Sequence, residues 1–65
     1  METTADFSRM ARNCEKNLLW VEALYFWRMA LKVFPNIPGE LADQHRDQII
    51  TAINADMETI DSERS

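Results

Sequence analysis

The 65-residue chain has little of several residue types on which common functional sites depend. Its single cysteine, Cys14, excludes an internal disulfide, and together with the single histidine, His45, it is too little for a zinc site. The single glycine excludes a glycine-rich loop that cradles phosphate. The longest apolar run, 23–27, is far too short to cross a membrane. We therefore expect no catalytic site, no cofactor, no metal ion and no membrane span.

Positive charge is also scarce, particularly in the second half of the chain. The formal net charge is −4, and residues 36–65 hold seven acids but only two bases. Sequence-independent DNA binding needs a basic face, so a protein partner is favoured and direct DNA binding is disfavoured. A less favoured alternative is DNA binding by one cluster of bases from the first half: Arg9, Arg12, Lys16, Arg28 and Lys32.

The chain length sets the domain organisation. Sixty-five residues make one small domain, 1–65, and a domain of this size is marginally stable unless something adds burial. Without a disulfide or a metal, the usual source is association, so we expect a homodimer. The first residues have neither a basic region nor an apolar region of the signal-peptide type, and we expect a cytoplasmic, reducing location.

Apolar residues recur at i, i+3, i+4 and i+7, which predicts helices over 4–16, 19–34 and 38–60. Thr3 or Thr4 can cap the first helix, Asn17 is the expected left-handed residue at its end, and Pro35 stops the second helix. Residues 61–65 are expected to fray. The fold class is therefore all-α, a helical hairpin followed by a third long helix.

The core is predicted from the apolar positions of these three helices. His45 falls among the apolar positions of the third helix and is expected to pack at the edge of the core. The predicted core residues are Phe7, Met10, Cys14, Trp20, Leu24, Trp27, Leu31, Phe34, Leu41, Ile49 and Ile53.

The second predicted helix is apolar on more than one face. One interpretation is that it is the central, buried helix of a three-helix bundle. The other is that part of it forms a homodimer interface or a partner-binding surface, since aromatic side chains and methionine are enriched at such surfaces. The predicted interface residues are Leu19, Glu22, Tyr25, Phe26, Met29 and Val33.

The hairpin resembles a single tetratricopeptide repeat in the spacing of its apolar and small residues. The matching positions are Phe7, Met10, Ala11, Cys14, Ala23, Trp27, Ala30 and Pro35. One such repeat cannot bury its own face, so the resemblance implies a stacking neighbour.

A second resemblance bears on function. The string Glu15-x4-Trp20-x2-Ala23-x3-Trp27-x2-Ala30, followed by Asn36, resembles the core of the ANR family, negative regulators of AraC-type transcriptional activators in enterobacteria and their phages. The pair Leu19-Trp20 also resembles the PerC-like regulators, in which two arginines usually follow; here Val21 and Glu22 stand in those places.

These resemblances imply a small non-enzymatic modulator of transcription. It would act by protein–protein interaction with an AraC-type activator or a nucleoid protein such as H-NS. The alternative function is that of a phage-encoded helical protein that inhibits a host enzyme or defence factor.

Overall fold

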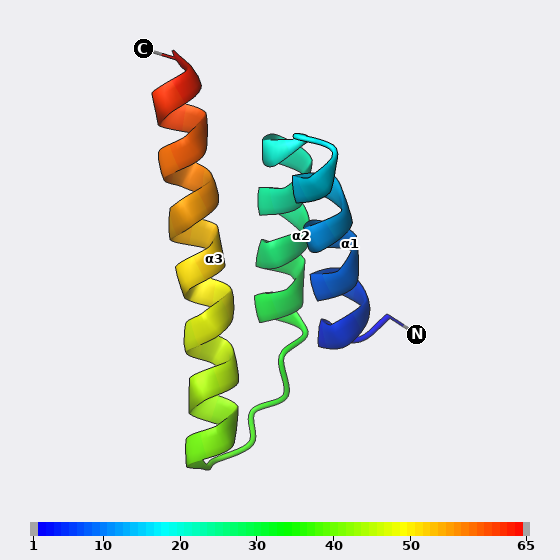
Figure 1. Cartoon of the computed structure of the whole chain (residues 1–65). Coiled ribbons are helices and arrows are strands. Elements are labelled where there is room, and N and C mark those ends of the chain that lie inside the picture. The colour runs from blue at the N-terminus through cyan, green and yellow to red at the C-terminus, as the bar shows by residue number, and fades with distance from the viewer. Residues whose placement is uncertain (1, 65) are drawn as a thin grey trace.

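The computed structural model describes residues 2–64, and three helices account for most of them: α1 (Thr4–Lys16), α2 (Trp20–Lys32) and α3 (Glu40–Arg64). Helices α1 and α2 form an antiparallel hairpin, and the longer α3 runs back along α2 (Figure 1). No strand occurs in the described part of the chain. The predicted all-α fold, a helical hairpin with a third long helix, is confirmed.

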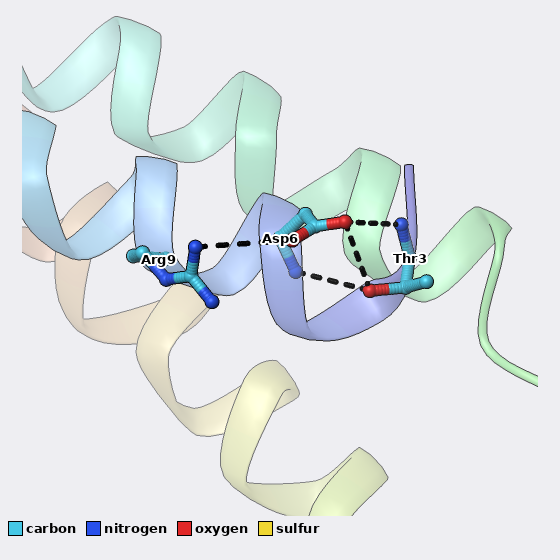
Figure 2. Close-up of polar contacts among 3 residues, drawn as sticks. All are labelled: Thr3, Asp6 and Arg9. Carbon is cyan, nitrogen blue, oxygen red and sulfur yellow. Dashed lines mark hydrogen bonds and ion pairs between the residues drawn. The ribbon is translucent and has the colours of Figure 1, made fainter. Parts of the chain in front are cut away.

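A reciprocal pair of hydrogen bonds sets the start of α1. The hydroxyl of Thr3 accepts from the backbone N–H of Asp6 (3.3 Å), and a carboxylate oxygen of Asp6 accepts from the N–H of Thr3 (3.1 Å), as Figure 2 shows. This capping box satisfies two backbone donors that would otherwise lack partners at the helix end. Helix α1 therefore has the predicted bounds.

The turn between α1 and α2 differs from the prediction. Asn17 has φ −96°, whereas Leu18 is the residue in the left-handed region, with φ 60°. The reason is that the chain reverses one residue later, where the N–H of Leu19 donates to the carbonyl of Cys14 at 2.8 Å. The left-handed region is one that leucine rarely adopts. Because Leu18 adopts it, the helical geometry is interrupted there, and α2 begins at Trp20 rather than at residue 19.

The remaining helix ends follow from proline and glycine. Helix α2 ends at Lys32, before the predicted residue 34, because Pro35 disfavours helical geometry in the residue that precedes it. Gly39 has φ 139°, which no helix accommodates, so α3 begins at Glu40 rather than at residue 38.

The C-terminal end of α3 corrects a further prediction. Residues 61–64 were expected to fray, but α3 continues to Arg64; Ser65 lies outside the described residues. After Gly39 the chain has no helix breaker, and a basic residue in the last turn interacts favourably with the helix dipole.

The core lies where α2 packs against its two neighbours, because α2 is the central helix (Figure 1). Ala11 from α1 and Ala23 and Ala30 from α2 are fully buried, and these small side chains let the helices approach closely. Within this contact the hydroxyl of Thr4 donates to the carbonyl of Ala30 at 3.0 Å. The buried apolar residues are Phe7, Ala11, Ala23, Trp27, Ala30 and Ile49.

Most of the predicted core residues lie in or beside this cluster. Phe7, Trp27 and Ile49 are buried, and five others are partly buried against them: Met10, Cys14, Leu31, Phe34 and Ile53. Trp20 and Leu24 are half-buried. The prediction for Leu41 is wrong, since its side chain is 82% exposed. The cause is length: α3 has 25 residues and α2 has 13, so the first turn of α3 extends past the hairpin (Figure 1).

Candidate interaction surface

The outer face of α2 carries large side chains that no other helix covers. Val21, Tyr25, Arg28 and Lys32 follow one another at spacings of four, three and four residues, which places them on one face of a helix. All four are exposed, and Leu18 lies just before the first of them. We call Leu18 and these four residues the α2 row. Leu18, Val21 and Tyr25 are 70%, 65% and 59% exposed, respectively.

The two ends of the α2 row differ in chemistry. At the apolar end, Leu18 and Val21 line a small cavity of about 280 Å³, to which Ile60 and Arg64 near the end of α3 also contribute. At the other end stand the two bases, Arg28 and Lys32. Tyrosine and arginine, which the α2 row supplies as Tyr25 and Arg28, are enriched among the residues that dominate binding at protein–protein interfaces.

The residues predicted for an interface on α2 do not all lie on one surface. Leu19, Glu22, Tyr25 and Val33 are exposed. Phe26 and Met29, in contrast, are partly buried against the core, and the ring of Phe26 stacks on Phe7 with centroids 6.4 Å apart. These two side chains are therefore less accessible to a partner than the four exposed ones. Tyr25 belongs to both the predicted set and the α2 row.

A buried acidic cluster lies on the inner side of the molecule, where all three helices meet. The indole N–H of Trp27 in α2 donates to a carboxylate oxygen of Glu15 in α1 at 3.0 Å. Asp56 of α3 interacts with both of these residues. Its side chain is only 3% exposed, and its Oδ2 is buried without a hydrogen-bond partner among the described residues.

Burial controls the ionisation of Asp56. Desolvation, followed by the hydrogen bond and the negative charge of Glu15, raises the pKa of this carboxyl group from 3.8 to about 7, and the nearby indole of Trp27 acts in the opposite direction. The carboxyl group is therefore partly protonated at neutral pH. Since a substrate cannot reach a side chain that is 3% exposed, we interpret this cluster as part of the packing between α3 and the hairpin.

Sequence reasoning missed this cluster. Asp56 lies seven residues after the buried Ile49, so helical spacing alone puts it on the same face of α3. The apolar residue beside it, Met57, is 43% exposed. An acid at a core position is the signal that could have revealed the cluster.

The single cysteine is half-buried, and the single histidine is exposed with one ring contact. Cys14 is partly buried against the core, and the ring of His45 contacts Phe34 edge to face, with centroids 5.3 Å apart. Within residues 2–64, no three His, Cys, Asp or Glu side chains lie close enough together to hold a metal ion. In the same residues no helix is both long and apolar enough to cross a bilayer, because the long α3 is rich in charge.

Comparisons with known proteins do not identify a family for this chain. No protein-family model matches the sequence, and neither the curated proteins nor the solved structures contain a match.

Proposed function

We propose that this chain is a non-enzymatic transcription modulator that binds a regulatory protein through the α2 row. The observation that carries the proposal is the exposure of Leu18, Val21 and Tyr25, each more than half exposed at one end of a single row. Contiguous exposed apolar side chains of this size mark interaction surfaces. The proposed partner is an AraC-type activator or an H-NS-like nucleoid protein, as the resemblance to the ANR family implies.

The positions that carry this resemblance have a structural explanation. Glu15 accepts the hydrogen bond of Trp27, and Ala23 and Ala30 are fully buried. They hold α1 against α2 and are therefore unavailable to a partner. A protein that shares them would share the hairpin, and its choice of partner would depend on exposed positions such as those of the α2 row.

The proposed mechanism is occlusion. The apolar end of the α2 row would cover a surface that the regulator needs for its own dimerisation or for DNA contact. Arg28 and Lys32 would then pair with acidic groups of the regulator and fix the orientation of the complex. The predicted homodimer would use the same row, so that self-association and regulator binding would compete.

A binding measurement with paired variants tests this function. We would titrate a purified AraC-type activator, and separately H-NS, into the chain by calorimetry. The double variant Val21→Gln, Tyr25→Gln removes the exposed apolar groups and keeps good helix formers, and we expect it to weaken binding at least about tenfold. Leu41→Gln is the control, because it removes an apolar side chain from α3 that is more exposed than Val21 or Tyr25.

The outcomes separate the possibilities. Binding that is lost in the double variant and retained in Leu41→Gln supports the proposal. Equal binding by both variants, or no binding by the unmodified chain to either regulator, contradicts it. Light scattering of the same samples reports whether the α2 row also mediates a homodimer.

A further inference from the structure

A second concave surface lies on α1. It is a groove of about 690 Å³ that runs along α1 and reaches α3 at His45. We call it the α1 groove. The residues that line it are Ala5, Ser8, Arg9, Met10, Arg12, Asn13, Lys16 and His45.

The α1 groove is positively charged although the protein is acidic. It holds three of the seven lysines and arginines and no acid. Arg9, Arg12 and Lys16 follow at i, i+3 and i+7, which places the three charges on one face of α1.

These charges are not neutralised within the protein. Arg12 and Lys16 have no carboxylate partner among residues 2–64. Arg9 has only a long, exposed ion pair with Asp6, with 3.9 Å between the guanidinium nitrogen and Oδ1. The other carboxylate oxygen of Asp6 accepts the hydrogen bond of the helix cap (Figure 2). An exposed ion pair of this kind contributes little.

The walls of the groove also contain apolar and unsatisfied polar groups. Ala5 and Met10 contribute apolar surface, and the Oγ of Ser8 is buried with no hydrogen-bond partner within residues 2–64. The guanidinium of Arg12 stands 5.7 Å from the ring centroid of Trp27, a cation–π contact that holds it in place. A matching ligand would therefore combine acidic groups with apolar ones.

We infer that the α1 groove binds an acidic amphipathic segment of a partner protein. Such a segment places carboxylates against Arg9, Arg12 and Lys16 and apolar side chains against Met10 and Ala5. A nucleic acid fits less well, because its phosphates would extend over α3, which carries seven acids and only two bases. The inference does not depend on the function proposed for the α2 row.

The test uses a defined probe. A synthetic peptide of about 16 residues built from Glu, Leu and Ala supplies an acidic amphipathic helix. The same peptide with Gln in place of Glu is its neutral control. Binding to the ¹⁵N-labelled chain is followed through amide chemical shifts, which report both the affinity and the residues affected. The double variant Arg9→Gln, Lys16→Gln removes two groove charges whose side chains are exposed.

We expect the acidic peptide to shift amides of α1 and His45, and the groove variant to bind it about tenfold more weakly. The matched control is Arg28→Gln, Lys32→Gln, which removes the same charge from α2 and should bind within about twofold of the unmodified chain. Equal weakening in both variants, equal binding of the neutral peptide, or tighter binding of a short DNA duplex would overturn the inference. The variant Val21→Gln, Tyr25→Gln should leave peptide binding unchanged, which keeps this test separate from that of the α2 row.

Discussion

The two faces of α2 both carry large apolar side chains, yet these side chains have opposite environments. The inner face presents Ala23, Trp27 and Ala30, all buried between α1 and α3, whereas the outer face presents Val21 and Tyr25 to solvent. The inner side chains alternate in size, so that two alanines admit neighbouring helices and one indole fills the space where three helices meet. The apolar residues made both faces of α2 candidates for burial. Helices α1 and α3 both pack on the inner face, so the outer face stays exposed.

The largest effect should come from removing the inner indole. Trp27→Ala deletes a buried ring, its hydrogen bond to Glu15 and its contact with Arg12, and should lower the free energy of unfolding by about 3–5 kcal/mol. That is most or all of the stability of a domain this small. Circular dichroism during thermal unfolding would measure the loss. A folded variant of unchanged stability would show that the inner face is not the structural core.

The inner face should also make stability depend on pH. The pKa of Asp56 is 3.8 in the unfolded chain and about 7 in the folded protein, so the folded state keeps the proton longer. The free energy of unfolding should therefore fall as pH rises from about 4 to about 7, by on the order of 2–4 kcal/mol, and then level off.

Urea unfolding at several pH values measures this dependence, and Asp56→Asn isolates it. The difference between the variant and the unmodified chain removes contributions from other acids, such as Asp6, whose pKa is lowered by its hydrogen bonds to Thr3 and by Arg9. The variant should be more stable than the unmodified chain at pH 8 and similar to it at pH 4. A difference that does not change with pH would contradict the buried position of Asp56.

A smaller effect should come from the one long-range hydrogen bond at the alanine contact. Thr4→Val removes the hydroxyl that donates to the carbonyl of Ala30 and keeps the shape of the side chain. The free energy of unfolding should fall by about 1–2 kcal/mol, because a buried acceptor loses its partner. Thr51→Val, at an exposed position of α3, is the control and should change stability by less than about 0.5 kcal/mol.

The smallest effect on stability should come from the outer face. Tyr25→Gln exchanges an exposed ring for a good helix former and should change the free energy of unfolding by less than about 0.5 kcal/mol. The same variant should weaken partner binding, so stability and binding would separate on this face. A loss of stability comparable to that of Thr4→Val would mean that the ring of Tyr25 contributes to packing, either on Phe26, which it contacts edge to face with centroids 5.4 Å apart, or on a second copy of the chain.

The sequence predicted much of this fold because its helices obey simple spacing rules. The capped helix α1 and the stop before Pro35 follow from local chemistry, and the burial of Phe7, Trp27 and Ile49 follows from periodicity. Leu41 was misplaced because periodicity does not say how far α3 extends beyond the hairpin. Asp56 was missed because its burial depends on Glu15 and Trp27, which reach it only through the tertiary packing of three helices.

The candidate surface was only partly predictable for the same reason. Leu19, Phe26 and Val33 repeat every seven residues, which suggested one interface, but the direction from which α1 packs decides which of them is covered. Phe26 packs against Phe7 of α1, whereas Leu19 and Val33 are exposed, as are Leu18, Val21 and Tyr25. Helical periodicity identifies an extra apolar face, and only the packing of the neighbouring helix identifies its members.

The most direct test of an open outer face is an amide chemical-shift map of the ¹⁵N-labelled chain with an unlabelled regulator. We expect the largest amide chemical-shift changes on the α2 row, at Leu18, Val21, Tyr25, Arg28 and Lys32. Ala23 and Ala30 on the buried inner face should change little. Shifts confined to α3, or spread evenly over both faces of α2, would contradict the claim that the outer face is the binding surface.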